Sequence, residues 1–131
     1  LIDESYNSNP LSLEFAIKNF DSLKFKNQRK YLLLGDMLEM GKFSKTLHKN
    51  IAKIINKTSI NKVYVYGKDI KETYYAISPD KRGKILSNIN EIYNLIKNDL
   101  NNNDYLMIKG SNSTGLNKFV TKIKKERINA L

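Results

Sequence analysis

The chain has 131 residues, enough for one compact domain, and its content of 40% hydrophobic and 27% charged residues excludes a disordered polypeptide. It contains no cysteine, which excludes disulfides and fits a reducing compartment, and no apolar run is long enough to span a membrane. The formal net charge of +10 indicates an attraction to anionic ligands such as nucleotides. Because lysines occur in every segment and arginine, which makes bidentate base contacts, is scarce, we favour solvated lysines over a nucleic-acid interface.

The amino end predicts a strand, a polar turn and the start of a helix. Residues 1–2 are typical of the end of a strand, and the acids Asp3 and Glu4 follow them. Pro10 suits the first turn of a helix, and Asn9 is a suitable N-cap before it. Ligands of open α/β sheets bind where the carboxyl ends of strands meet helix N-termini, so we expect a site to begin here. Because chains rarely begin with leucine inside a strand, we interpret this chain as a domain excised from a longer protein.

The rest of the chain alternates between helical and strand patterns. The unbroken apolar run over residues 31–34 is typical of a strand that is covered on both faces. Further strands are expected over residues 62–67, 84–87 and 105–108. A short helix is expected from Asp69 to Ala76. The longer helices have apolar stripes at helical spacing, made of Leu13, Ala16, Ile17, Phe20 and Leu23; of Leu47, Ile51, Ile54 and Ile55 after Ser44; of Ile89, Ile92, Tyr93, Ile96 and Leu100; and of Leu116, Phe119, Val120 and Ile123.

This alternation predicts the class of fold. Strands that alternate with helices form a mostly parallel sheet with helices on both faces. We therefore expect residues 1–131 to form one α/β domain, a Rossmann-like three-layer sandwich.

Three of the expected strand ends carry polar clusters, at residues 3–9, 35–39 and 109–113. Parallel strands have their carboxyl ends at the same edge of a sheet, so we expect the clusters to line one rim. The first two supply carboxylates that can bind ribose hydroxyls or a cation. The third supplies Lys109, two hydroxyls and a helix N-terminus, which suit a carboxylate or phosphate. The alternative is that these residues only form turns and caps, and for Asp36 and Glu39 we favour such a structural role.

Neither a metal site nor a phosphate loop is evident in the sequence. His48 is the only histidine and has no neighbouring cysteine, so we favour a packing or hydrogen-bonding role and expect no metal site. Residues 36–43 differ from the pattern G-x-x-x-x-G-K-[ST], because Asp36 stands where the first glycine is required and Phe43 follows Lys42. The chain therefore lacks a phosphate cradle of its own.

Four features, in order along the chain, resemble the carboxy-terminal domain of the Mur ligases. Residues 3–10, DESYNSNP, resemble the family's D-[DE]-S-Y-N-A-N-P, and residues 34–41, LGDMLEMG, resemble its L-G-D-M-x-E-L-G. His48 falls where the family has a histidine in the next helix, and residues 109–113, KGSNS, resemble K-G-S-R-S. The form is that of the members that add D-alanyl-D-alanine, although Asn112 replaces the family's arginine.

The resemblance implies an ATP-dependent ligase of peptidoglycan synthesis, located in the cytoplasm. Such an enzyme joins D-alanyl-D-alanine to UDP-N-acetylmuramoyl-tripeptide through an acyl phosphate. Its amino-terminal and central domains, which precede this one, carry most of the groups that bind ATP and Mg²⁺. The resemblance therefore implies that this domain closes over the others and is inactive alone, with neither a nucleic-acid nor a membrane partner.

The resemblance also implies roles for single residues. Asp3 or Glu4 approaches the ribose of the nucleotide, and the sequence leaves open which of the two does so. The residues implied to position the substrates are Tyr6, Asn7, Asn9, Lys109, Ser111 and Ser113, of which the last three hold the terminal carboxylate of the dipeptide. The residues implied to support the site from behind are Asp36, Glu39 and His48.

A different class of function is also compatible with the composition. A stand-alone basic α/β module could bind a nucleotide or a nucleic acid without catalysing a reaction. The two readings differ in whether a phosphate loop precedes this chain, because a ligase requires one.

Overall fold

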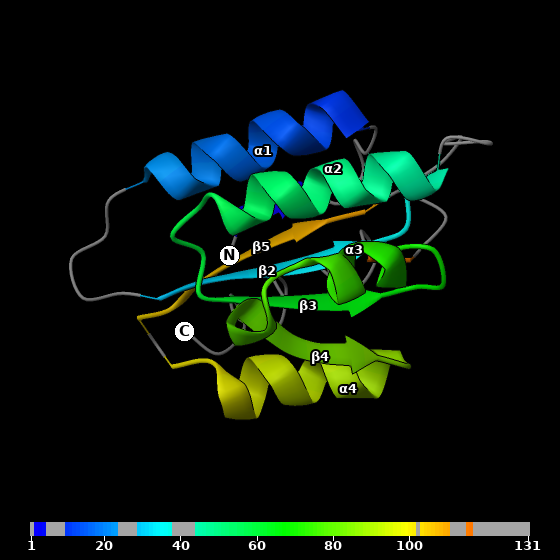
Figure 1. Ribbon diagram of the computed structural model, residues 1–131. Coiled ribbons are helices and arrows are strands. Elements are labelled where there is room, and N and C mark those ends of the chain that lie inside the picture. Colours follow the sequence, from blue (N-terminus) through cyan, green and yellow to red (C-terminus); the bar gives the residue numbers. More distant parts are fainter. Residues whose placement is uncertain are drawn as a thin grey trace.

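Five parallel strands form one sheet in the spatial order β1-β5-β2-β3-β4 (Figure 1). The computed structural model describes residues 2–4, 10–23, 29–37, 44–101, 103–110 and 115–116, of which residues 2–4, 10 and 44 are described by their backbone alone. The strands are β1 (Ile2–Glu4), β2 (Lys30–Gly35), β3 (Lys62–Tyr66), β4 (Arg82–Leu86) and β5 (Tyr105–Lys109). The expected α/β architecture is confirmed, and every strand pairing is parallel.

Helices cover both faces of the sheet, so the molecule has three layers. The helices are α1 (Pro10–Ser22), α2 (Ser44–Asn56), α3 (Lys71–Ala76) and α4 (Ile89–Asn94), with a short 3₁₀ turn η2 (Pro79–Lys81) and a π-helical turn η3 (Leu95–Asp99). In Figure 1, α1, α2 and α3 lie on one side of the sheet, and α4 lies beside β4 on the other. No helix in the described part of the chain is long and apolar enough to cross a bilayer.

The two faces of the sheet bury separate apolar cores, and β2 contributes to both. Leu32 and Leu34 pack with α1 and α2 residues such as Ile17 and Ile55. Tyr31 and Leu33 pack on the opposite face, in the cluster that contains residues of α4 and η3. Every residue of β2 is buried. This double coverage explains why the strand has an unbroken apolar run instead of alternation.

Two elements at the amino end of the chain differ in part from expectation. Strand β1 includes Asp3 and Glu4, which pair with residues of β5, so both acids lie in the strand and not in the turn after it. Helix α1 begins at Pro10, as expected, whereas the proposed cap Asn9 lies outside the described residues. Leu23 is 38% exposed because α1 ends one residue before it, so the prediction that it belongs to the buried stripe is wrong.

Other elements also begin one or two residues away from the positions expected from the sequence. Helix α3 begins at Lys71 and not at Asp69, because a hydrogen-bonded turn comes first. Strand β4 begins at Arg82, two residues before the expected start. After α4, the π-helical turn η3 places Leu95 in the core, where regular spacing had predicted Ile96, which is only partly buried. Of the expected last helix, Leu116 is described and buried, whereas residues 117–123 lie outside the described part.

Candidate functional site

The carboxyl ends of β1, β5 and β2 lie side by side at one edge of the sheet. Glu4 of β1 pairs with Lys109 of β5, and Lys109 pairs on its other side with Leu34 of β2. Gly110 then lies against Gly35, since a Cβ added to Gly110 would be 3.2 Å from the Gly35 Cα. The three polar clusters therefore begin at adjacent positions along one rim, as the parallel sheet predicted.

Lys109 is buried at the base of this rim. Its side chain is only 1% exposed, and its Nζ donates a hydrogen bond of 2.9 Å to the Oγ of Ser12 in the first turns of α1. A buried ammonium group must be hydrogen-bonded, because its transfer from water is otherwise very costly. The contact joins the end of β5 to the start of α1. Ser12 was missed at the sequence level, because nothing in the local pattern distinguishes it from other polar residues of the helix.

Asp36 holds the connection between β3 and α3. Its carboxylate accepts hydrogen bonds from the backbone N–H groups of Ile70, at 2.8 Å, and of Lys68, at 3.1 Å. Gly67, in the same connection, has φ of +141°, and a Cβ at this position would lie 2.6 Å from the Asp36 carboxylate. Only glycine fits both the backbone angle and the close approach. These contacts favour the structural role for Asp36.

His48 is fully buried in α2, and its backbone carbonyl contacts α3. The hydroxyl of Thr73, which is itself fully buried in α3, donates a hydrogen bond of 2.9 Å to the carbonyl oxygen of His48. The role of the His48 side chain stays a prediction.

Several of the predicted site residues cannot be compared with side-chain geometry. Asp3 and Glu4 are described by their backbone alone. The residues that lie outside the described part are Tyr6, Asn7, Asn9, Glu39, Ser111 and Ser113. Their roles stay predictions.

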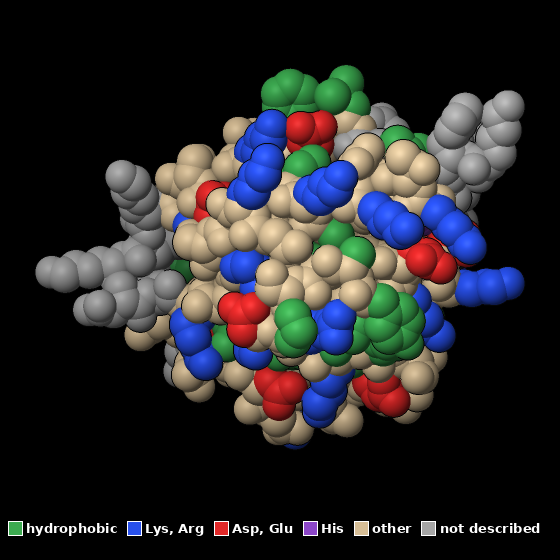
Figure 2. Space-filling view, in the orientation of Figure 1, with side chains coloured by type: hydrophobic (Ala, Val, Ile, Leu, Met, Phe, Trp, Pro, Cys, Tyr) green, Lys and Arg blue, Asp and Glu red, His purple; other side chains and the backbone are tan. Residues whose placement is uncertain are grey.

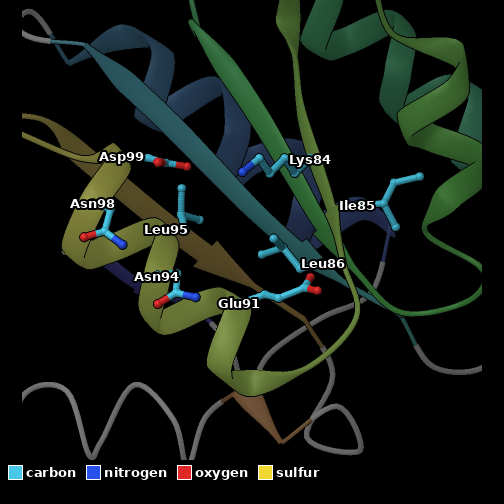
Figure 3. Close-up of a pocket in the computed structure, with 8 residues that line it drawn as sticks. All are labelled: Lys84, Ile85, Leu86, Glu91, Asn94, Leu95, Asn98 and Asp99. Carbon is cyan, nitrogen blue, oxygen red and sulfur yellow. The ribbon is translucent and has the colours of Figure 1, made fainter.

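Two cavities that are lined by described residues lie away from this rim. A groove of about 490 Å³ separates the edge strand β4 from α4 and η3, and Lys84 and Asp99 point toward one another across it (Figure 3). Its Glu91 carboxylate accepts a hydrogen bond of 2.7 Å from the Ser87 N–H and so helps to cap α4. A second depression, of about 350 Å³, lies near the amino ends of β2 and β3. Its Lys81 donates to the carbonyl oxygens of residues 58 and 60, so this cation is held within the protein.

The described residues do not form a metal centre. No three or more His, Cys, Asp or Glu side chains come together in the described ranges in a way that could hold an ion. Two tyrosines of the core have raised pKa values. Burial raises the pKa of Tyr64 to about 12, and it also raises the pKa of Tyr31. Both tyrosines pack on the face of the sheet that α4 covers.

Comparison with known proteins assigns the chain to a family. The family model described as "Mur ligase, glutamate ligase domain" matches residues 1–112. The chain belongs to the Mur ligase family. Of the curated relatives, the UDP-N-acetylmuramoyl-tripeptide–D-alanyl-D-alanine ligase of Buchnera aphidicola subsp. Baizongia pistaciae is 34% identical over 128 residues, which is 96% of this chain and 26% of the relative. The ligase of the same name from Bacillus subtilis is 40% identical over 68 residues, 52% of this chain and 15% of the relative.

Solved structures of the family share this fold. The MurF ligase from Thermotoga maritima, crystallised with ADP, superposes with a TM-score of 0.73 at 20% identity and covers 97% of this chain and 28% of that chain. A MurF structure from Acinetobacter baumannii gives a TM-score of 0.73 at 18% identity and covers 92% of this chain and 27% of that chain. The chain thus spans about a quarter of the length of these proteins.

Proposed function

We propose that this chain is the carboxy-terminal domain of an ATP-dependent ligase that joins D-alanyl-D-alanine to UDP-N-acetylmuramoyl-tripeptide. The observation that carries the proposal is the strand register, in which Glu4, Lys109 and Leu34 are direct neighbours across three strands. The three motifs that resemble the family therefore start from one rim. Two curated relatives that carry this activity in their names add support.

In the proposed reaction, a carboxylate oxygen of the tripeptide attacks the γ-phosphorus of ATP, which yields an acyl phosphate and ADP. The amine of D-alanyl-D-alanine then attacks the carbonyl carbon. The bond from this carbon to the phosphate oxygen breaks, inorganic phosphate leaves, and the nitrogen loses a proton as the amide forms. We expect the reaction in the cytoplasm, since it consumes ATP. As the resemblance to the family implies, we assign Mg²⁺ and the nucleotide phosphates to preceding domains.

The role that we propose for this domain is to position the incoming dipeptide. An amine held close to the acyl carbon reacts as if it were at a very high local concentration. Lys109 and the hydroxyls of Ser111 and Ser113 would bind the dipeptide's terminal carboxylate, and Asp3 or Glu4 would face the ribose. The buried contact between Lys109 and Ser12 supports a fixed position for the ammonium group, because it leaves that group little freedom. Closure of the domain would also exclude water, which otherwise hydrolyses the acyl phosphate.

Steady-state kinetics of the full-length ligase test this role. Lys109→Met keeps an unbranched side chain but removes the ammonium group. We expect it to raise the KM for D-alanyl-D-alanine at least about 10-fold, the usual effect of losing a charged hydrogen bond, with little change in the KM for ATP. Ser12→Ala is the matched control, because it removes one internal partner of the same ammonium group and leaves the charge in place. If both KM values of Lys109→Met equal those of Ser12→Ala, Lys109 has only a structural role.

A further inference from the structure

The outer side of α2 and the residue after it carry a row of four lysines, none of which forms an ion pair with a described acid. Lys45, Lys49, Lys53 and Lys57 are all exposed and are spaced four residues apart, so they follow one another along the helix and its last turn at intervals of about 6 Å. Helix α2 contains no Asp or Glu. In the described ranges, the ion pairs are Lys18–Glu14 and Arg29–Asp104, so none of them engages the row.

Some other lysines of the described residues have structural partners. Lys30 donates a hydrogen bond of 2.6 Å to the carbonyl oxygen of Asp21, and Lys62 donates one of 2.7 Å to that of Asp80. The lysines of α2 instead repel one another, because like charges four residues apart destabilise a helix. Lys45 also lies in the first turn, where the helix dipole disfavours a positive charge. The fold therefore gains nothing visible from this arrangement.

Two large apolar side chains are exposed on the neighbouring helix. Leu11 and Phe15 of α1 are 64% and 61% exposed and lie four residues apart. The opposite sides of α1 and α2 pack into the same core, so the exposed sides of both helices face away from the same side of the sheet. Figure 2 shows Lys and Arg side chains gathered over these helices, with hydrophobic side chains protruding above them. We call Leu11, Phe15 and the four lysines of the row the α1–α2 surface.

We propose that the α1–α2 surface binds the surface of a lipid bilayer that contains anionic phospholipids. A row of lysines attracts anionic headgroups through charge alone, and exposed Leu and Phe side chains insert at the boundary with the acyl chains. A protein partner fits less well, since lysine is depleted in protein interfaces. Nucleic acid also fits less well, because the surface lacks the arginines and the row of aromatic side chains that bind bases.

The proposal departs from the expectation of no membrane partner. The lack of a long apolar run excludes a spanning helix, but it does not exclude binding at the membrane surface. The proposal is also independent of the proposed ligase activity, because no residue of the α1–α2 surface belongs to the rim at the carboxyl ends of β1, β5 and β2.

Cosedimentation of the full-length protein with vesicles tests the proposal. We expect binding to vesicles of phosphatidylcholine with 30% phosphatidylglycerol, and its loss on pure phosphatidylcholine or in 0.5 M salt, where charges are screened within about 4 Å. The double variant Lys49→Gln with Lys53→Gln should lower the partition coefficient of the protein onto these vesicles at least about 10-fold. The matched control is Lys84→Gln with Lys97→Gln, which changes the net charge equally on β4 and η3 and should bind like the wild type.

A third variant separates insertion from charge. Leu11→Ser with Phe15→Ser should weaken binding several-fold while the dependence on salt stays unchanged, and ligase activity without vesicles should stay at the wild-type level in all these variants. Equal losses of vesicle binding in the α2 double variant and the control double variant would overturn the proposal, because binding would then depend on net charge alone. Absence of wild-type binding to anionic vesicles, or tighter binding to a single-stranded RNA homopolymer than to them, would also overturn it.

Discussion

Replacing Gly67 by alanine should destabilise the protein through two separate effects. The backbone at Gly67 has φ of +141°, which costs a residue with a Cβ about 1–3 kcal/mol. The new Cβ would also lie 2.6 Å from the Asp36 carboxylate, which accepts two backbone hydrogen bonds from the connection between β3 and α3. Displacing a charged acceptor costs about 1.5–3 kcal/mol in a buried site and less at this half-exposed one. We therefore expect a loss of about 2–4 kcal/mol in the free energy of unfolding.

Urea unfolding followed by circular dichroism measures this loss. Gly115→Ala is the matched control, because Gly115 also has positive φ, at +77°, but no other described residue lies within 4 Å of a Cβ placed there. It should therefore lose only the backbone contribution. A double-mutant cycle isolates the contact: in an Asp36→Ala background, Gly67→Ala should cost less, because the clashing carboxylate is gone. Equal costs in both backgrounds, or equal costs for Gly67→Ala and Gly115→Ala, would refute the argument.

Two further predictions concern Tyr64. Burial raises its pKa from 10.0 to about 12, so the folded state holds the phenolic proton more tightly than the unfolded state does. The pKa shift therefore stabilises the folded protein by about 2–3 kcal/mol, an effect that is fully present below pH 10 and is lost as the pH rises through 12. Urea titrations at several pH values should show that Tyr64→Phe loses less stability at alkaline pH than the wild type does. Gly83→Ala would place a Cβ 2.6 Å from the Tyr64 ring, so we expect a cost of about 1–3 kcal/mol by thermal unfolding, and an unchanged melting temperature would contradict this packing.

The class of fold, and the end of the sheet that carries the site, could be predicted from the amino-acid sequence. The unbroken run of β2 required cover on both faces, and the alternation of strands and helices required parallel pairing, since a parallel connection needs a crossover. Parallel pairing in turn brings the carboxyl ends of the strands together. For these reasons the local patterns and the family motifs were enough to predict that the polar clusters lie along one rim.

Contacts between residues that are far apart in the chain became visible only in the folded structure. The insertion of β5 between β1 and β2 makes Glu4 and Lys109 neighbours, and the contact of Lys109 with Ser12 joins residues 97 positions apart. The Asp36 carboxylate accepts a hydrogen bond from the backbone N–H of Ile70, 34 positions away, so this residue of the family motif supports a loop. Local propensity carries no information about such pairs, because their free energy depends on strand order and register, which are fixed only when the whole sheet assembles.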